Sequence, residues 1–478
     1  MGQNANLLNA AIAVTRFGLG AAPGEIDTVA ADPKGWLNAQ IKPSGAPNPP
    51  GQWADTDARM ADYVRYRQDT RRPGRRAGDP APTMAEAEAA REAYQAARRA
   101  LTQGTDAEFL ARARLASETP DGFAERWALF WSNALTTSAI KFPSEVFMGQ
   151  YERDAIRPFV FGRFEDLLLA AESHPAMLLY LDQAESAGPK SVLGQRRDAG
   201  LNENLAREIL ELHTVGADAG YGQADVTELA RALTGWSVPT ARDRPGGGTR
   251  ARATAIERGP RGFVFRPGLH EPGDRTVMGR RYEAAGKRQG EAILRDLANH
   301  PATARRLARR IAVHFVADDP PPALVGRLEA AWTRSGGDLA TVARALIDAP
   351  EAWVAPAAKI KTPYEFIVSS HRALGTRPQR AQTLRQALNV MGQPAFRPPS
   401  PEGWPDTAAD WAGPDALVKR LNWAKDVGDR AENMDASAVA AGALGPRLGE
   451  RSRLAIARAE SRAESLVLFL MAPEFQRR

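Results

Sequence analysis

Helical periodicity recurs along almost the whole chain, and it limits the fold more than any other feature of the sequence. Ala, Leu, Arg and Glu dominate, and apolar residues return every three or four positions. Several of these segments begin with a proline in the first turn, where the missing N–H group costs nothing; examples are 301–316, 322–335 and 363–374. We therefore expect a mainly α fold, a multi-helix globular assembly.

The exception to this periodicity lies near residues 263–279. Phe263-Val264-Phe265 and the segment 275–278 alternate in the manner of short strands, and Pro-Gly turns lie between them. This pattern predicts one small β-hairpin. Long irregular loops complete the fold, among them the segment 394–414, which is rich in Pro, Gly and Trp.

Composition divides the chain into four subregions. Residues 1–60 contain N-terminal helices, 61–120 a charged insertion, 121–290 the central helices with the hairpin, and 291–478 a C-terminal helical part. Within the insertion, residues 70–82 are charged, rich in Pro and Gly and free of aromatic side chains, which predicts disorder. Thr83 and Glu86 then form a capping box. It opens an alanine-rich helix to about residue 101, before a second helix over 107–117.

The composition also excludes several classes of function. The chain of 478 residues has no cysteine, which removes disulfides, thiolate nucleophiles and cysteine-ligated metals. Its net charge of +6 is modest, and no DNA- or RNA-binding motif accompanies the arginine runs, so we expect no nucleic-acid partner. No apolar run reaches the roughly 18 residues of a membrane span. The first residues lack the basic start of a signal peptide.

The segment from Leu201 to Trp236 holds the strongest candidate for chemistry. It places six carboxylates, two arginines and a histidine on two short helices and the turn between them, whose other faces are apolar. On a helical wheel Asn204, Glu208 and Glu211 share one side between the apolar stripes. A buried carboxylate without a partner is costly, so these groups must pair, bind a ligand or act in catalysis.

The functional interpretation assigns a carbohydrate-directed hydrolase or lyase to these residues. Two carboxylates could serve as general acid and base, arginines could hold an anionic or polyol substrate, and tryptophans could stack on a glycan. The candidate catalytic residues are Glu208, Glu211 and Asp225. The candidate substrate-binding residues are Glu203, Asn204, Arg207, Arg231, Trp236, His270 and Trp404.

Two alternatives stay open. The same charges could neutralise one another in a closed core, which is typical of a non-catalytic scaffold or binding partner in an exported complex. His270, on the predicted hairpin turn, could also join Glu208 or Glu211 in a metal-dependent enzyme. Its spacing matches no strong metal motif, so we assign no metal ligand, and the sequence names no cofactor.

Several motifs resemble the bacterial family catalogued as domain of unknown function 1800. They are NENLARE at 202–208, GYGQADVTELARALTGW at 220–236, HPATARRLARRIAVHFVADDPPPALV at 300–325, KIKTPYEF at 359–366, GQPAFRPPSPEGWP at 392–405 and APEFQRR at 472–478. The resemblance runs from Val14 to the last residue, so we interpret residues 1–478 as a single family unit.

The resemblance implies no activity, because none is generally assigned to the family. It implies an exported protein, periplasmic or secreted, and a protein partner related to alkaline phosphatases or sulfatases. This chain departs from the family pattern Phe-Trp-His-Asn-His-Phe, because Ser132 and Ala134 replace both histidines. If the family uses those histidines as ligands or bases, this chain has lost that function.

Overall fold

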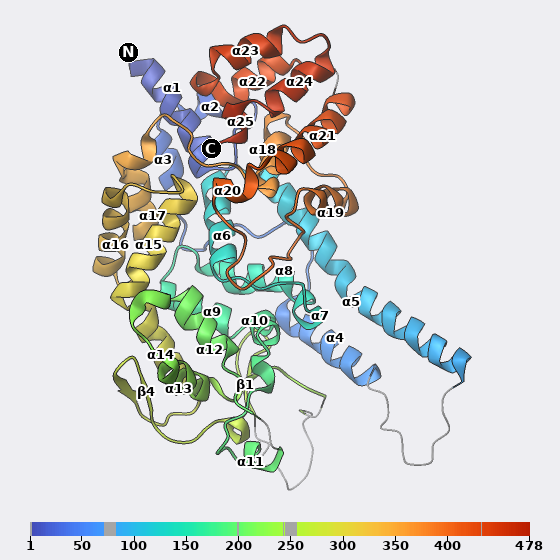
Figure 1. Cartoon of the computed structure of the whole chain (residues 1–478), viewed down its shortest axis with the longest axis vertical. Coiled ribbons are helices and arrows are strands. Elements are labelled where there is room, and N and C mark those ends of the chain that lie inside the picture. Colours follow the sequence, from blue (N-terminus) through green and yellow to red (C-terminus); the bar gives the residue numbers. More distant parts are fainter. Residues whose placement is uncertain (1, 71–82, 198–199, 242, 244–255, 432) are drawn as a thin grey trace.

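The computed structural model describes residues 2–70, 83–197, 200–241, 243, 256–431 and 433–478. Helices make up most of the described chain, and two small antiparallel sheets lie at one end of the molecule, which confirms the mainly α class (Figure 1). Residues 71–82, most of the segment with predicted disorder, lie outside the described residues.

The N-terminal subregion folds into short helices and one long antiparallel pair. The short elements are α1 (Gly2–Ile12), the π-helix η1 (Ala13–Phe17), α2 (Glu25–Val29) and α3 (Pro33–Asn38). The pair consists of α4 (Thr56–Asp69) and α5 (Met84–Glu118), which project together from the body (Figure 1). The predicted capping box is confirmed, since Glu86 N lies 3.2 Å from Thr83 Oγ1 and Thr83 N lies 2.8 Å from Glu86 Oε2.

The helix α5 differs from its prediction, because one continuous helix replaces the two predicted ones. It runs through Gly104, the residue at which the sequence favours a break. The side chain of Arg59 lies close to Gly104, and Thr105 donates a hydrogen bond of 3.2 Å to the carbonyl oxygen of Glu145. Packing against neighbouring elements therefore offsets the weak helix propensity of glycine here.

The central subregion carries short helices around α6. These elements are α6 (Gly122–Ala134), α7 (Phe142–Glu145), α8 (Met148–Gln150), η2 (Tyr151–Ile156), η3 (Arg157–Phe159), α9 (Phe164–Glu172), α10 (Pro175–Tyr180), η4 (Gln183–Glu185) and α11 (Gly194–Arg197). The segment that concentrated the charges then forms α12 (Asn204–Glu208), the π-helix η5 (Ile209–His213), η6 (Ala217–Ala219) and α13 (Gln223–Leu233). We call 201–236 the charged hairpin.

The two strand segments predicted near 263–279 are strands, but they do not pair with each other. β3 (Val264–Phe265) lies between β1 (Trp236–Ser237) and β2 (Glu257–Arg258), with Trp236 and Glu257 both opposite Phe265. β4 (Arg275–Val277) instead pairs with β5 (Arg280–Tyr282). Met278 and Gly279 make the connecting turn at φ +48° and +76°, as a two-residue hairpin turn requires. The short 3-10 helix η7 (Pro267–Leu269) separates the two sheets.

The C-terminal part is helical, as predicted, although the helices at 436–444 and 450–457 were not predicted. Its elements are α14 (Lys287–Ala298), α15 (Pro301–Phe315), α16 (Pro322–Ser335), α17 (Leu339–Asp348), η8 (Pro350–Trp353), α18 (Pro363–Ala373), α19 (Ala381–Val390), α20 (Ala408–Trp411), α21 (Pro414–Arg430), α22 (Ala436–Leu444), η9 (Gly445–Arg447), α23 (Glu450–Ala457), α24 (Arg462–Leu470) and α25 (Pro473–Gln476). Proline occupies the first turn of α15, α16 and α18, as predicted.

Two apolar cores hold these helices together. The large core contains Trp127 of α6 with buried side chains from α1 to α17, and the small core joins the C-terminal helices to the end of α5 through residues such as Phe109 and Phe366. Each large side chain that becomes fully buried contributes about 1.5–3 kcal/mol. The seam between the two cores passes beside α6, α15 and α18, and polar side chains gather there.

Candidate functional site

A cavity of about 120 Å³ lies at this seam. Its wall includes Tyr151 from the large core and Phe109, Tyr364 and Leu388 from the small core. Because one buried water needs about 10–15 Å³, the cavity has room for a group of the size of one sugar ring. Its charged and amide-bearing lining residues are Arg112, Arg126, Asn133, Glu152, His314, Glu365, Gln393 and Asp406.

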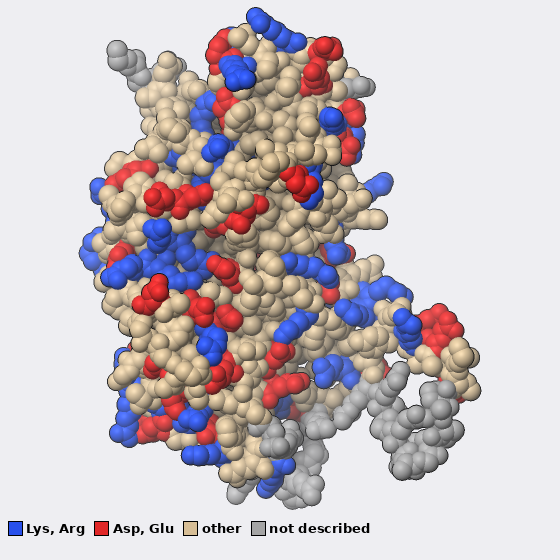
Figure 2. Space-filling model, in the orientation of Figure 1, with Lys and Arg blue, Asp and Glu red and all other residues tan. Residues whose placement is uncertain are grey.

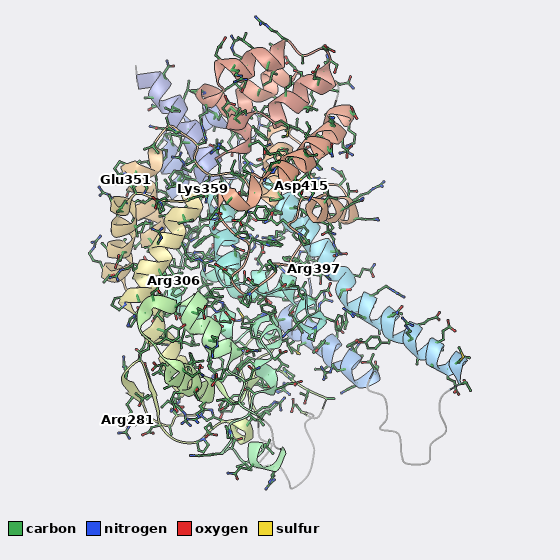
Figure 3. The ribbon with its side chains drawn as sticks, in the orientation of Figure 1. Arg281, Arg306, Glu351, Lys359, Arg397 and Asp415 are labelled. Atoms are coloured by element: carbon green, nitrogen blue, oxygen red, sulfur yellow. The ribbon has the colours of Figure 1, made fainter. Side chains whose placement is uncertain are left out.

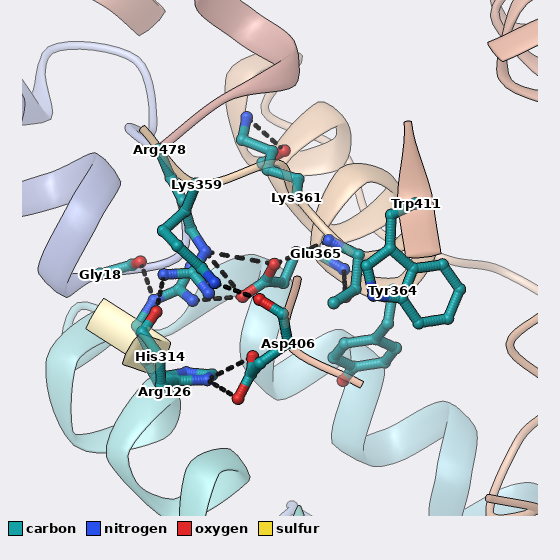
Figure 4. A network of polar contacts seen from close by, with 12 residues as sticks. Gly18, Arg126, His314, Lys359, Lys361, Tyr364, Glu365, Asp406, Trp411 and Arg478 are labelled. Atoms are coloured by element: carbon teal, nitrogen blue, oxygen red, sulfur yellow. Dashed lines mark hydrogen bonds and ion pairs between the residues drawn. The ribbon is translucent and has the colours of Figure 1, made fainter. Parts of the chain in front are cut away.

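His314 and Asp406 form a hydrogen-bonded dyad in the cavity wall. His314 lies in the last turn of α15, and its Nδ1 atom is 2.9 Å from Oδ1 of Asp406 (Figure 4). Burial opposes the ionisation of Asp406, but the interaction with His314 and the positive charges of Arg478 and Lys359 outweigh it and lower its pKa to about 2. The carboxylate is therefore ionised and can only accept, so Nδ1 of His314 carries the proton.

The other ring nitrogen of His314 is consequently a lone-pair acceptor. Nε2 is buried and has no hydrogen-bond partner among the residues that the structure describes. Burial lowers the pKa of His314 below its usual value, although Asp406 opposes this shift, so the ring is neutral at pH 7. A neutral histidine that is oriented by a carboxylate and has a free Nε2 is suited to accept a proton.

Glu365 on α18 lies next to the dyad, between two buried arginines from distant parts of the chain. Arg126 of α6 donates a short hydrogen bond to Oε1, and Nε of Arg478 lies 3.1 Å from the same atom (Figure 4). The two arginines outweigh the effect of burial and hold the pKa of Glu365 well below its usual range. Arg126 also donates from Nε to the carbonyl oxygen of Gly18 at 2.6 Å.

Two buried lysines stand behind this network. Lys359 donates through Nζ to the carbonyl oxygen of Asp406 and pairs with Asp318, which fixes the loop that carries Asp406. Lys361 donates to Oγ of Ser369 at 2.9 Å, and burial lowers the pKa of its amine well below the usual value. The backbone N–H of Arg478 donates to the carbonyl oxygen of Lys359 at 2.9 Å, which places Arg478 beside Glu365.

Aromatic, amide and hydroxyl-bearing residues also line the cavity. Asn133 of α6 bonds the backbone of Trp404 twice, through Nδ2 to its carbonyl oxygen at 2.9 Å and through Oδ1 from its N–H at 2.7 Å. Trp404 is half-buried at the rim, with its ring 6.3 Å from that of Trp411. Ser132 and Tyr364 line the cavity, and the buried hydroxyl of neither has a hydrogen-bond partner in the described part of the chain.

The position of Ser132 gives meaning to the departure from the resembled family pattern. Ser132, which replaces the first histidine of that pattern, lines the cavity, whereas Ala134, which replaces the second, is buried at the end of α6.

Burial raises the pKa of Tyr364, so its hydroxyl stays protonated and can donate. The cavity thus combines an acceptor at His314 with a hydroxyl donor at Tyr364.

The charged hairpin occupies a different place, and its predicted residues divide into separate groups. Glu203 accepts from Arg207 at 3.4 Å, from Gln223 at 2.8 Å and from Thr227 at 2.7 Å. Glu203 and Arg207 are four residues apart, so this pair follows from the helical spacing. Asn204 is exposed at the start of α12.

Asp225 and Arg231 have partners within and beside α13. Asp225 accepts from the N–H groups of Gly222 at 2.8 Å and Met278 at 2.6 Å, so it caps the helix and ties it to the turn between β4 and β5. Arg231 lies 2.5 Å from Glu228, as the spacing predicts, and Glu228 also accepts from Arg275 at 3.4 Å.

Glu208 and Glu211 lie on either side of the change from α- to π-helix, which the 3.6-residue period does not predict. Burial raises the pKa of Glu208, and the nearby His213 opposes that shift. The π-turn places Nδ1 of His213 2.8 Å from Oε1 of Glu172, with both side chains fully buried. Single π-turns of this kind are frequent at functional sites.

Trp236 and His270 lie near the sheets. Trp236 is 1% exposed and packs edge-on against Phe263, so its ring belongs to the large core. Nδ1 of His270 is 2.9 Å from the carbonyl oxygen of Thr234, and burial lowers the pKa of His270. Of the predicted site residues, Trp404 lines the cavity, and none of those on the charged hairpin does.

The sequence contained a signal for the residues that its charge pattern missed. His314, Glu365 and Arg478 each lie within one of the family-like motifs, at 300–325, 359–366 and 472–478. Asp406 directly follows the motif that contains Trp404. These four motifs therefore meet at the cavity, whereas the motifs at 202–208 and 220–236 lie on the charged hairpin. Convergence of motifs in space points to the cavity, and local charge density does not.

Metal-binding groups and membrane-spanning helices among the described residues also bear on the class of site. No group of three or more His, Asp or Glu side chains there is placed to share a metal ion. None of the helices in that part of the chain combines the length and apolar character needed to cross a membrane.

Comparison with known proteins places the chain in a family. The model of the family described as protein of unknown function (DUF1800) matches residues 12–477, so the chain belongs to this family. No curated protein and no solved structure matches.

Proposed function

We propose that this member of the DUF1800 family is a hydrolase or lyase for a carbohydrate-like substrate, and that His314 is the base of the reaction. The free Nε2 lone pair of a neutral histidine, oriented by Asp406 in a cavity wall, is the observation that carries the proposal. General bases of this kind contribute about 10²–10⁴-fold to the rate.

Other residues that line the cavity with His314 support the substrate class. Trp404 presents a half-buried indole at the rim, and an aromatic face of this kind packs well against the apolar face of a sugar. Tyr364, Ser132 and Asn133 supply hydroxyl and amide groups, which match a polyol by hydrogen bonding. The size of the cavity fits one sugar ring.

His314 and Tyr364 could divide the proton transfers of such a reaction. Nε2 of His314 takes a proton from the attacking water in a hydrolase or from the substrate in a lyase, and Asp406 stabilises the imidazolium that forms. The bond to the glycosidic oxygen breaks, the hydroxyl of Tyr364 donates a hydrogen bond to that oxygen, and the proton taken by His314 passes to it, so that the leaving group departs as an alcohol. The Arg126–Glu365–Arg478 network holds the wall behind them in place.

Glu208 is the second candidate for acid–base chemistry. Burial raises its pKa, which is the direction that a general acid requires, and it lies beside a π-turn. In this alternative Glu208, Glu211 and Asp225 carry the reaction on the charged hairpin. An exported location and a partner related to alkaline phosphatases or sulfatases stay predictions of the family resemblance.

A panel of polysaccharides and oligosaccharides tests the proposal, with released reducing ends and new unsaturated products as the measurements. We expect turnover of at least one glycan by the unaltered protein, and a kcat about 10²–10⁴-fold lower for His314→Gln. Glu208→Gln is the matched control and should keep its kcat within about threefold, since our proposal gives Glu208 no share of the general-base effect. Circular dichroism confirms that each variant is folded. Full activity in His314→Gln would overturn the proposal.

A further inference from the structure

Two arginines of α15 lie between the cavity and the charged hairpin without an acidic partner. Arg306 and Arg310 are one helical turn apart and so share a face. Among the described residues, neither has a carboxylate oxygen within 4 Å, whereas their neighbours Arg305 and Arg309 pair with Glu329 at 3.3 Å and Asp319 at 3.9 Å. Figure 2 shows a gathering of basic side chains over α15, and Figure 3 labels Arg306 there.

Each of the two arginines uses few of its five N–H groups. Arg306 donates a short hydrogen bond to the carbonyl oxygen of Leu212 in η5, and Arg310 donates at 3.5 Å to that of Ala134 at the end of α6. These contacts cap two helix ends, as arginines often do. Neither side chain makes a further hydrogen bond within the described residues, so the remaining donors are available to a ligand.

The electrostatics of this pair favour an anion. Burial lowers the pKa of Arg306 to about 10, and the positive charge of Arg310 adds to the shift, while Glu402 and Glu211 oppose it. Burial also lowers the pKa of Arg310, against the more distant Asp406 and Glu402. Two partly desolvated like charges repel each other, so an anion placed between them would relieve both the repulsion and the lost hydration.

We propose that Arg306 and Arg310 bind an oxyanion group of the substrate, so that the glycan is an acidic one carrying carboxylate or sulfate groups. Arg310 lies one turn before His314 on α15, and its charge acts on Asp406 of the dyad, so the bound group lies next to the cavity. The planar guanidinium fork matches the geometry of both oxyanions. The identity of the ligand as substrate rests on the proposed function, whereas the binding of an oxyanion does not.

Calorimetric titration of the full chain at constant ionic strength tests this inference with glucuronate, glucose and inorganic sulfate as probes. We expect glucuronate to bind about tenfold or more tightly than glucose, since a hydrogen bond to a charged group has at least this worth. Binding of sulfate as well would show that the site recognises oxyanions generally, and preference for glucuronate would assign a carboxylate. Equal binding of glucuronate and glucose, with no binding of sulfate, would overturn the inference without any variant.

Matched variants on the same helix locate the binding. Arg306→Gln and Arg310→Gln should each weaken oxyanion binding about tenfold, while Arg305→Gln, one residue away and already paired, should leave it unchanged. Arg310→Lys keeps the charge but not the fork, so it serves if Arg310→Gln fails to fold. An equal loss in Arg305→Gln would overturn the site, because it would indicate a diffuse basic surface.

The two proposals can fail separately. His314→Gln should bind inorganic sulfate as the unaltered protein does, since sulfate has no sugar ring to place in the cavity beside His314. Oxyanion binding in a protein without turnover of any glycan would remove the proposed reaction and leave this site in place. Turnover of neutral glycans alone, with no oxyanion binding, would leave the proposed reaction in place and remove the oxyanion site.

Discussion

The charged hairpin and the cavity differ in how their charges are assembled. On the hairpin, six carboxylates lie within 36 residues of sequence, and Glu203 and Glu228 find arginine partners on the same or a neighbouring element. At the cavity, Arg126, Glu365 and Arg478 come from positions hundreds of residues apart and meet in a buried network. A high local density of charges therefore indicates ion pairs between residues that are close in sequence. The site with a free acceptor is formed instead by residues that are far apart in sequence.

The two regions also differ in where their unsatisfied groups lie. Asp225 and Glu203 on the hairpin use their oxygens in caps and surface pairs, and the buried nitrogens without partners there, such as Nε2 of His213, belong to residues that do not line the cavity. In the cavity, Nε2 of His314 and the hydroxyl of Tyr364 are buried without partners among the described residues. Because a buried polar group without a partner is destabilising, groups of this kind are typical of sites that bind ligands.

The largest difference in stability should come from Glu365. Glu365→Gln leaves the buried Arg126 and Arg478 without their counter-charge, and we expect it to lower the free energy of unfolding by about 3–5 kcal/mol. Chemical denaturation followed by circular dichroism measures this change. Glu203→Gln is the control on the hairpin, where the pair with Arg207 is partly exposed, and it should cost about 1 kcal/mol or less. Equal losses would mean that the two networks do not differ.

Substitutions at the two predicted stacking residues should affect different properties. The change at Trp236 should lower stability, and the change at Trp404 should weaken glycan binding. Trp236→Ala opens a hole in the large core and should cost about 3–5 kcal/mol of stability. Trp404→Ala should weaken glycan binding by about 0.5–1.5 kcal/mol and change stability less than Trp236→Ala does. Thermal unfolding and titration with the glycan found in the panel measure the two effects. Unchanged glycan affinity in Trp404→Ala would mean that the indole of Trp404 does not pack against the sugar, contrary to our proposal.

Local structure could be predicted from the sequence where it depends on the residues of a single element. The bounds of α16 and α17 agree with the helical period, and the capping box at Thr83 and Glu86 forms as predicted. The π-helix at 209–213 did not follow, because its apolar pattern fits an α-helix equally well. The pairing of β3 with β1 and β2 depends on residues far along the chain, so adjacency in sequence misleads there.

The candidate site followed from the sequence only in part, for a related reason. Trp404 was identified as a binding residue, and it lines the cavity. His314 and Asp406 are 92 residues apart and each is unremarkable within its own segment, so no spacing rule joins them. A helical wheel places Glu208 and Glu211 on one side of a single helix, whereas a cavity is formed by several elements packed together.

The pH dependence of kcat/KM on the first glycan that is turned over tests the central claim most directly, because the two regions predict opposite signs. His314 acts as a neutral base with a lowered pKa, so activity should rise with pH to a plateau, with its midpoint below 6.5. Glu208 as a protonated acid with a raised pKa would instead make activity fall as the pH rises above 4.5. A rise that ends in a plateau by pH 7, and that His314→Gln abolishes, is the result we predict. A fall over the same range that Glu208→Gln abolishes would contradict the account and return the chemistry to the hairpin.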